Sequence, residues 1–427
     1  MVDIARNGSS RHLAGKILGS LIPFAGAALL FAAPAHADWI TTWSAAPVKP
    51  APHLGPMMTS PSFNDQTLAQ TLRIAAGGKA LRVRLTNVFG ATPLEIGGAR
   101  IALLDANGAE IPGTAHMLRF AGKETAQVAA GAPLLSDAIT MDVPDLARLS
   151  LQLYLPGETG PCTCHQAGLD EMRVSPQGNY LGKPFTPVQT LQNRPFLAAV
   201  EVDAVDGAGT IAMLADSITD GIGSTVGANR RWPDYLAARL SAVAPGKWGI
   251  ANQGISGNRV LNGGFGESAL ARLDRDILAV PGVRYLIVFE GINDIGISFG
   301  AAQRSPRAGP PLALMEGGRI DLEMMLAGYR QIAERARARG IVPIGATIAP
   351  FRGAALWTED GEALRQGINA AIRSGEIFDA WLDFDAAFRD PEDPSQMRPG
   401  YHMGDFLHGT DAGYEAVANS IDLSIFK

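Results

Sequence analysis

One serine in the C-terminal half of the chain has the surroundings that a catalytic nucleophile needs. Ser217 directly follows an apolar run at residues 211–215 and precedes a stretch of small, polar and flexible residues. Such a run predicts a buried strand that ends in a turn. In open α/β sheets, ligands bind at the carboxyl ends of the strands. Ser217 therefore stands where a nucleophile is useful, although a lone serine after a strand more often only caps the next helix.

A serine nucleophile needs a base, which is usually a histidine. Beyond residue 37 the candidates are His53, His116, His165, His402 and His408. His408 follows Asp405 by three residues, and one turn with that spacing can place a carboxylate beside the ring's Nδ1. The carboxylate would then fix the tautomer and stabilise the imidazolium, while Nε2 faces Ser217. A lone histidine near a helix start is more often structural, so the spacing alone does not decide its role.

An acyl-transfer site also needs hydrogen-bond donors for the oxyanion. Two stretches could supply them, residues 252–258 and 290–294, each at the end of a predicted strand. The glycines of the first stretch would let a backbone N–H approach closely, and the Asn293 amide could supply a side-chain donor. Glycine and asparagine are also common in ordinary strand-end turns. The joint occurrence of both stretches with Ser217 and the Asp-x-x-His spacing is what indicates acyl transfer.

A second serine competes for the role of nucleophile. Residues 296–300 match the Gly-x-Ser-x-Gly nucleophile elbow around Ser298. An elbow needs a strand directly before it and a helix directly after it. The predicted strand instead ends near Gly291, and a loop rich in glycine and proline follows. We therefore expect Ser298 to lie in a loop.

The chain has two cysteines, Cys162 and Cys164, which lie beside His165. A disulfide between residues two apart is strained and uncommon, and a fourth metal ligand at suitable spacing is not visible. We therefore expect two small thiols on one face of a loop or strand. No metal ion and no organic cofactor is implied.

The composition suits a soluble globular protein with a large core, since 47% of the 427 residues are hydrophobic and 18% are charged. A net charge of −6 without a basic stripe argues against a nucleic-acid partner. Residues 1–37 have the pattern of a secretory signal peptide, with basic residues, an apolar run at 17–33 and an Ala-x-Ala site at 35–37. The mature chain is expected to start at Asp38 and to be periplasmic or secreted. No other stretch is long and apolar enough to span a bilayer.

Residues 38 to about 200 are expected to be all-β. Apolar and polar residues alternate at 70–75, 80–86 and 149–155, which is typical of half-buried strands. Many short strands with frequent turns predict a sandwich or jelly roll. A boundary is expected within 203–209, giving a β-sandwich domain at 38–205 and a catalytic domain at 206–427.

From residue 210 the pattern changes to strand, then helix, repeated. Strands are expected at 210–216, 248–254, 285–290, 342–348 and 379–384, and helices at 232–243, 268–279, 321–339, 360–374 and 411–424. This alternation predicts a parallel sheet covered on both faces. The glycine- and proline-rich segment 298–318 is a candidate lid over the acyl group, because loops this long are usually functional or mobile. The loop at 161–168 is the other candidate wall.

These motifs resemble those of the SGNH hydrolases, also called GDSL-type esterases and lipases. The four motif regions of that family match residues 215–218, 254–258, 291–294 and 405–408. The resemblance implies a flavodoxin-like, three-layer α/β/α domain. It also implies that Ser217 is the nucleophile, that His408 is the base and that Asp405 orients it. The oxyanion hole would consist of the Ser217 and Gly257 backbone N–H groups and the Asn293 side chain.

The β-rich part is similar, at residues 41–46 and 80–90, to the β-sandwich that precedes the catalytic domain in some secreted members. Two positions depart from the family pattern. Ala215 stands where glycine is usual, and its Cβ could tighten the turn or force its φ negative. Gly409 follows the histidine where proline is usual, which could loosen that loop. Neither departure removes a reacting group.

The expected function is that of a secreted serine esterase or lipase that hydrolyses carboxylic esters through an acyl-enzyme. The expected substrates are small-molecule, lipid or acylated-carbohydrate esters. Two alternatives stay open. One is a carbohydrate- or surface-binding protein with a weakened catalytic domain, and the other is an acyltransferase that uses the same three residues.

Overall fold

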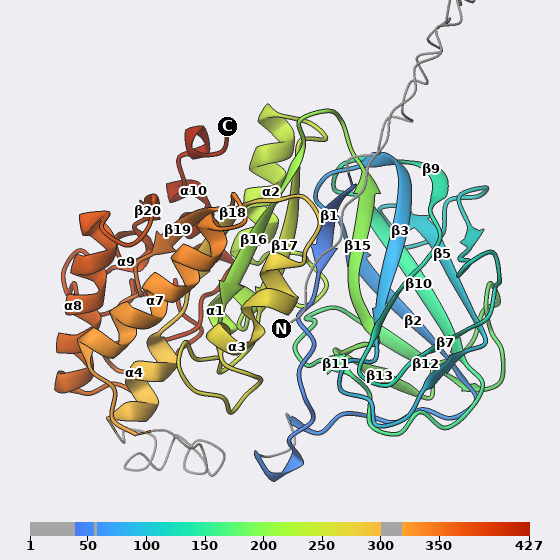
Figure 1. Ribbon diagram of the computed structural model, residues 1–427, viewed down its shortest axis with the longest axis horizontal. Coiled ribbons are helices and arrows are strands. Elements are labelled where there is room, and N and C mark those ends of the chain that lie inside the picture. The colour runs from blue at the N-terminus through green and yellow to red at the C-terminus, as the bar shows by residue number, and fades with distance from the viewer. Residues whose placement is uncertain (1–38, 55–57, 300–317) are drawn as a thin grey trace, which may run out of the picture. The chain divides into compact units, whose positions relative to one another are not determined.

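The computed structural model describes residues 39–54, 58–299 and 318–427 (Figure 1). Residues 300–317 of the candidate lid at 298–318, and the expected signal peptide at 1–37, lie outside the described residues. Within the described part of the chain, no helix is long and apolar enough to cross a membrane.

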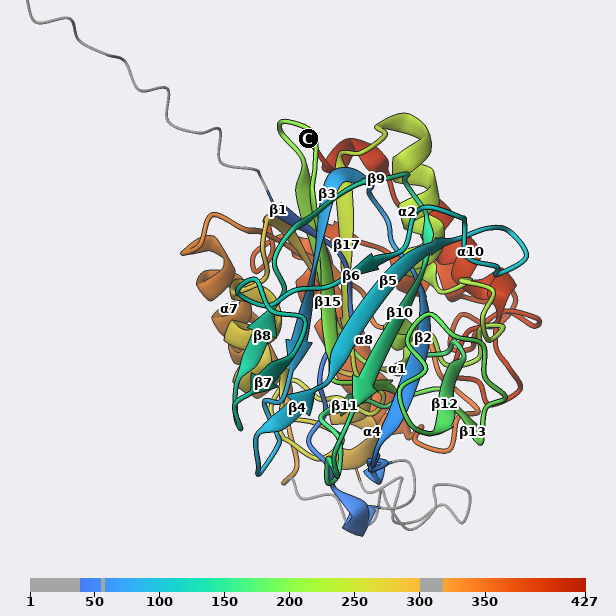
Figure 2. The same ribbon diagram turned by 90° about the vertical axis from the view of Figure 1, so that its right-hand side faces the viewer.

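The N-terminal part consists of antiparallel sheets, as the alternating pattern predicts. One sheet has the order β1 (Trp39–Ser44), β15 (Leu197–Asp203), β3 (Gly78–Thr86) and β8 (Pro133–Leu135), and β9 (Ile139–Val143) also pairs with β3. The other has the order β13 (Gln189–Leu191), β12 (Met172–Gln177), β2 (Gln66–Arg73), β10 (Arg148–Leu155), β5 (Gly98–Leu104) and β6 (His116–Met117). Figure 2 shows β5, β10 and β2 side by side. The two inner faces bury one shared hydrophobic core, which makes this part a β-sandwich.

Two short strand pairs complete the N-terminal part. They are β4 (Leu94–Ile96) with β7 (Ala126–Val128), and β11 (Cys164–His165) with β14 (Arg194–Pro195). A 3₁₀ turn, η1 (Pro52–Leu54), lies in the segment after β1.

The C-terminal part is built on a parallel sheet of order β17 (Trp248–Gly254), β16 (Gly209–Ala215), β18 (Val283–Phe289), β19 (Val342–Ala346) and β20 (Ala380–Leu382). Every residue of β16 is buried. Continuous burial of this kind is typical of a central parallel strand that is covered on both faces.

Helices cover both faces of the parallel sheet (Figure 1). One face carries α3 (Ala269–Leu273), α4 (Ile292–Ser298), α7 (Leu322–Arg337) and α8 (Glu359–Ser374). The other carries α2 (Trp232–Val243), α9 (Phe384–Phe388) and α10 (Asp411–Ser420). The remaining elements are α1 (Ser217–Asp220), the π-helical turn η3 (Asp274–Leu278) and the 3₁₀ turn η4 (Leu423–Ile425). This arrangement confirms the three-layer α/β/α fold with a preceding β-sandwich.

The structure corrects the prediction for Ser298. The segment after β18 is not a loop, because α4 begins at Ile292 and Ser298 is its last residue. The Ser298 hydroxyl accepts a hydrogen bond from the Ile320 N–H over 2.6 Å. Gly296 disfavours a helix by propensity, but a Cβ at this position would lie 2.7 Å from the Leu356 side chain. Close packing therefore outweighs the local preference.

Strand β1 joins the two parts by direct backbone contact with the parallel sheet. The Thr41 N–H donates to the Pro281 carbonyl over 3.2 Å and lies 3.0 Å from Thr210 Oγ1. Gly249 in β17 faces the Thr41 carbonyl so closely that a Cβ there would lie 2.2 Å from the oxygen. The boundary predicted at 205/206 falls between β15 and β16 and stays a prediction.

We predict that Gly249→Ala destabilises the protein by roughly 2 kcal/mol or more, because the added methyl group meets rigid backbone that cannot move aside cheaply. Gly157→Ala is the matched control, since a Cβ there would meet only Glu95 Oε2 at 4.0 Å. Urea unfolding of both variants measures the difference. Equal free energies of unfolding for the two variants would show that the β1–β17 contact relaxes without cost.

Candidate active site

Ser217 is the first residue of the short helix α1, directly after β16. Asp216 precedes it as the N-cap, and its Oδ1 accepts from the Ile218 N–H over 2.9 Å. Ser217 is only 5% exposed, and its exposed surface faces the cleft that it helps to line. The first N–H groups of a helix have no intrahelical acceptor, which leaves the Ser217 N–H unpaired within its own helix.

The structure brings Ser217, His408 and Asp405 together in the order that the Asp-x-x-His spacing predicts. His408 Nε2 lies 2.9 Å from Ser217 Oγ, and His408 Nδ1 lies 2.6 Å from Asp405 Oδ2. Asp405 Oδ1 accepts from the backbone N–H groups of Leu407 and His408, each over 3.0 Å. These bonds fix the carboxylate and the ring at the same time.

The surroundings of Asp405 keep its carboxylate negatively charged beside the His408 ring. Burial on its own would raise the pKa of Asp405, but hydrogen bonds from the His408 side chain and backbone outweigh it and lower the pKa to about 2. The carboxylate therefore stays ionised at any pH at which the protein would work, so it can hold the ring as a hydrogen-bond acceptor and stabilise a positive charge on it.

The loop that carries Asp405 and His408 has an unusual backbone conformation at one residue. Phe406, between Asp405 and His408, has a φ of 58°. Its ring stacks on His402 at 4.4 Å between centroids, and His402 Nδ1 accepts from the Phe406 N–H over 3.3 Å. A non-glycine residue in the left-handed region persists only when its surroundings hold it there. His402 thus acts in this loop as a structural support.

Gly409 does not loosen the loop that carries His408, but allows it to pack closely against the loop that follows Ser217. A Cβ on Gly409 would lie 2.6 Å from the Tyr414 ring, and a Cβ on Gly223 would lie 2.3 Å from the Gly409 carbonyl. Tyr414 also donates its hydroxyl to the Ile222 carbonyl over 2.5 Å. The departure at this position therefore permits tight packing of the two loops.

Ala215, the other departure from the family pattern, is accommodated without strain. It is the last residue of β16 and is fully buried, and it is not among the non-glycine residues with positive φ. The Cβ therefore needs no unusual backbone conformation, because the backbone at Ala215 does not have a positive φ.

The three expected oxyanion donors gather around one cleft with Ser217 and His408. Gly257 has a φ of 77°, and a Cβ there would lie 2.3 Å from the Phe265 ring. The position therefore requires glycine. Asn293 Nδ2 donates to the Asn258 carbonyl over 3.0 Å, which uses one of its two hydrogens. Among the described residues, no group accepts from the N–H of Ser217 or of Gly257.

A buried arginine, not identified from the sequence, links the strand ends that carry these groups. Arg272 is fully buried, and its guanidinium donates to the carbonyls of Ala215 and Gln253 and to Asn258 Oδ1, over 3.1, 2.7 and 2.9 Å. It therefore fixes the ends of β16 and β17 relative to each other. In the sequence, the one signal for this role was that Arg272 falls on the apolar face of the helix predicted at 268–279.

Near the loop that carries Gly257, Asp220 and His165 form a second group that the sequence did not reveal. Asp220 ends α1, and its Oδ1 lies 2.9 Å from Nε2 of His165, which belongs to the β-sandwich part. Asp220 Oδ2 accepts from both the N–H and the hydroxyl of Ser256, over 3.1 and 2.8 Å. The bonds to Ser256 connect this group to the residue before Gly257.

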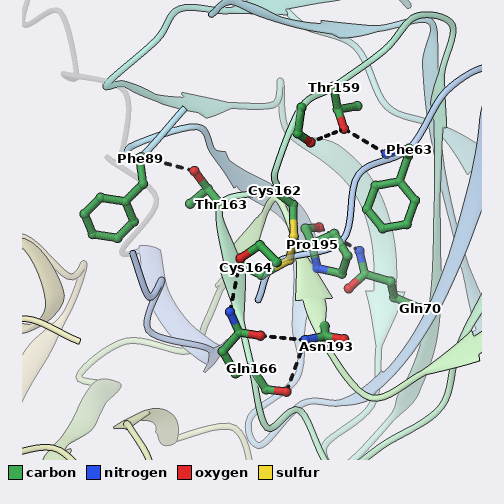
Figure 3. Close-up of a disulfide and its surroundings, with 12 residues drawn as sticks. Phe63, Gln70, Phe89, Thr159, Cys162, Thr163, Cys164, Gln166, Asn193 and Pro195 are labelled. Carbon is green, nitrogen blue, oxygen red and sulfur yellow. Dashed lines mark hydrogen bonds between the residues drawn. A yellow bond between two sulfur atoms is a disulfide. The ribbon is translucent and has the colours of Figure 1, made fainter. Parts of the chain in front are cut away.

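The prediction of two separate thiols is wrong, because Cys162 and Cys164 form a disulfide (Figure 3). Their Cα atoms are 5.4 Å apart, which is within the range that a disulfide permits even at this short spacing. Among the described residues, no group of three or more histidine, cysteine, aspartate or glutamate residues could hold a metal ion.

The cleft beside Ser217 has a volume of about 1010 Å³ and is formed by both parts of the chain. Its apolar lining from the N-terminal part is Val48, Pro52, Met58, Pro61, Ala167 and Leu191. Its apolar lining from the C-terminal part is Ile222, Ile255, Phe265, Leu356 and Leu407. The expectation that the β-rich part contributes a wall therefore has direct structural support.

Three buried carboxyl groups lie behind the nucleophile. Burial raises the pKa of Asp216 to about 7 and that of Asp294 to about 6. Burial, followed by the charge on Asp216, raises the pKa of Glu290 well above its usual range. Asp294 also accepts from the backbone N–H groups of Val260 and Leu261, which ties α4 to the loop that carries Gly257. The cluster thus carries fewer than three negative charges near neutral pH.

We predict that Asp216→Asn makes the protein more stable at pH 8 than the wild type, by roughly 2 kcal/mol. An aspartate in the unfolded chain has a pKa of about 3.9, so between about pH 4 and pH 7 the folded state binds more protons at Asp216 than the unfolded state. The free energy of unfolding therefore falls as the pH rises through that window, and the penalty persists above it. Asparagine removes this term while keeping an acceptor for the Ile218 N–H.

Urea unfolding at pH 5 and pH 8 measures the effect, with Asp206→Asn in the exposed turn after β15 as the matched control. The gain in stability should be larger at pH 8 than at pH 5 for the Asp216 variant only. The same pH dependence in wild type and variant would mean that Asp216 is ionised without penalty.

Comparison with known proteins gives a family for the C-terminal part. The model of the GDSL-like Lipase/Acylhydrolase family matches residues 216–416. A search of curated protein sequences found no match.

Similar solved structures include an acetyl xylan esterase variant from Geobacillus stearothermophilus, with 22% identity over 50% of this chain and 93% of that one, and a TM-score of 0.38. Another is a GDSL-like lipase from Bacteroides thetaiotaomicron, with 17% identity over 52% of this chain and 89% of that one, and a TM-score of 0.36. The part of the chain that matches the GDSL-like Lipase/Acylhydrolase family model, residues 216–416, includes Ser217, Asn293 and His408.

Proposed function

We propose that this protein is an exported serine esterase that hydrolyses neutral carboxylic esters with an apolar acyl group, through an acyl-enzyme on Ser217. The observation that carries the proposal is the continuous chain of hydrogen bonds from Ser217 Oγ through both ring nitrogens of His408 to Asp405. A serine hydroxyl is a weak nucleophile unless a base of this kind takes its proton.

In the first half of the proposed reaction, Ser217 Oγ attacks the ester carbonyl carbon and its proton passes to His408 Nε2. The imidazolium is stabilised by Asp405, which accepts from Nδ1. The negative charge that develops on the carbonyl oxygen would be met by the N–H groups of Ser217 and Gly257 and the second hydrogen of Asn293 Nδ2. Collapse of this intermediate breaks the bond to the alcohol oxygen, which takes the proton from His408.

In the second half, a water molecule attacks the acyl carbon while His408 Nε2 takes one of its protons. The same donors stabilise the second tetrahedral intermediate. Its collapse breaks the bond to Ser217 Oγ, which recovers the proton, and the carboxylic acid is released. His408 thus accepts and returns each proton that is transferred in the two steps.

The lining of the cleft supports a neutral, apolar substrate. Its titratable side chains within the described residues are His165, Asp220 and His408, and each is already hydrogen-bonded to a partner. A charged substrate group would therefore find no free counter-charge there. A volume of about 1010 Å³ is far more than an acetyl group fills, so longer acyl groups would bury additional apolar surface.

Export is proposed on two observations of different kinds. The first 37 residues have the pattern of a cleavable signal peptide. The Cys162–Cys164 disulfide suits an oxidising compartment.

We predict that Ser217→Ala lowers kcat on p-nitrophenyl esters by roughly three or more orders of magnitude, because it removes the hydroxyl that lies 2.9 Å from His408 Nε2. Ser298→Ala is the matched control, since Ser298 ends α4 and bonds to Ile320. Steady-state kinetics, with thermal unfolding to verify the fold, decide the matter. Loss of activity in the Ser298 variant but not in the Ser217 variant would refute the assignment.

Ala167 lines the cleft on the side of the β-sandwich part, and Ala167→Phe would narrow the cleft there. We predict that this variant lowers kcat/KM for decanoyl esters at least ten-fold and changes kcat/KM for acetyl esters by less than three-fold. Each buried methylene group contributes about 0.8 kcal/mol, so excluding two of them suffices. Ala130→Phe, at an exposed turn of the same part, is the control. An unchanged ratio of decanoyl to acetyl rates would show that the acyl chain does not occupy this side of the cleft.

A further inference from the structure

His165 comes from the β-sandwich part but is buried beside the candidate active site, with only 6% of its surface exposed. It belongs to β11, which pairs with β14, and it follows the Cys162–Cys164 disulfide directly. The neighbouring Gln166 accepts a hydrogen bond from Asn193 over 2.7 Å (Figure 3). The backbone around His165 is thus fixed by a covalent bond, a strand pair and a side-chain bond.

Both ring nitrogens of His165 face acceptors. Nδ1 lies 2.9 Å from the Ala46 carbonyl, and Nε2 lies 2.9 Å from Asp220 Oδ1. A carbonyl can only accept, and Asp220 also accepts two hydrogen bonds from Ser256 at its other oxygen. Nδ1 therefore carries a hydrogen, and an imidazolium, which has a hydrogen on each ring nitrogen, can donate to both acceptors at once.

The electrostatic surroundings agree with this assignment. Burial lowers the pKa of His165, but the charge and hydrogen bond of Asp220 and the Ala46 carbonyl outweigh it, and the net pKa is raised. The cation Arg194 of β14 acts against protonation of the ring, and it is paired with Asp170 at 3.6 Å. Arg231, before α2, also faces Asp220 and Asp170.

Asp220 transmits the position of His165 to the oxyanion side of the site. Its backbone N–H donates to the Asp216 carbonyl over 2.9 Å, so it moves with the turn that carries Ser217. Its Oδ2 holds the N–H and the hydroxyl of Ser256, the residue directly before Gly257. A residue at the end of α1 thereby sets the distance between the nucleophile and the loop with the Gly257 N–H.

We propose that His165 is a positioning residue for ester hydrolysis, which holds Asp220 and Ser256 so that the Gly257 N–H faces the developing oxyanion. This inference rests on the proposed esterase function. It makes the β-sandwich part a component of the catalytic apparatus and not only a wall of the cleft. Removal of the His165 ring would take away the hydrogen-bond partner of Asp220 Oδ1, and the Asp220 side chain would then be free to turn away from Ser256.

The test compares His165→Gln with the wild type on p-nitrophenyl acetate and with a boronic acid, which forms a tetrahedral adduct on the serine. Glutamine can donate only through its single amide nitrogen, so it cannot hold both Ala46 and Asp220. We expect kcat to fall ten- to one-hundred-fold, KM to change less than three-fold, and boronate affinity to fall in parallel with kcat. His116→Gln, on β6 of the same sandwich, is the matched control and should match the wild type.

A purely structural role for His165 would lower the melting temperature while leaving kcat and boronate affinity of the folded protein within two-fold of the wild type, and that result would overturn the proposal. If His165→Gln does not fold, Ser256→Ala decides, because it removes one bond to Asp220 and keeps the Gly257 N–H. We then expect a three- to ten-fold lower kcat, and an unchanged kcat would overturn the proposal.

The two proposals fail in different ways. A wild-type protein without esterase activity, or with activity that survives Ser217→Ala, overturns the esterase function and this inference with it. Activity that depends on Ser217 but is unchanged in the His165 and Ser256 variants overturns this inference alone.

Discussion

The candidate active site depends on one hydrogen bond of 2.9 Å, between Ser217 Oγ and His408 Nε2, which joins residues 191 positions apart. Neither loop could hold this contact by itself. Asp216 caps α1 and orients the serine, and Asp405 orients the ring through three hydrogen bonds. Gly409 allows the two loops to pack without a gap. The contact is thus a consequence of packing throughout the C-terminal part, where the carboxyl ends of the parallel strands meet.

The β-sandwich contributes to the site at two depths. At the surface it supplies one apolar side of the cleft, including Met58 and Leu191. Below the surface, His165 pairs with Asp220 and so reaches the loop that carries Gly257. Because Met58 and Leu191 belong to the apolar lining, whereas His165 and Asp220 are hydrogen-bonded to each other, the two contributions should separate experimentally into effects on selectivity and effects on turnover.

The sequence predicted the parts of the structure whose signals are local. The apolar run before Ser217 predicted the bounds of β16 to within one residue. Asn293, which follows a predicted strand, and His408, which precedes a predicted helix, lie in the same cleft as Ser217, as expected from the sequence. Helix α4 was missed because Gly296 weakens its local propensity and only packing against Leu356 explains the glycine. The roles of Arg272 and His165 depend on contacts between segments far apart in the sequence, which no spacing rule reveals. The disulfide was missed because its short spacing usually excludes one, yet the local bend brings the two Cα atoms into range.

Covalent labelling of the folded protein with a fluorophosphonate, followed by digestion and tandem mass spectrometry, tests whether Ser217 is the activated nucleophile. A fluorophosphonate reacts with a serine that a neighbouring base has activated and leaves a phosphonyl group on its oxygen. We expect one modified site, Ser217, and simultaneous loss of ester hydrolysis. Labelling of Ser298 or another serine instead, or full ester hydrolysis by protein whose Ser217 is modified, would contradict it.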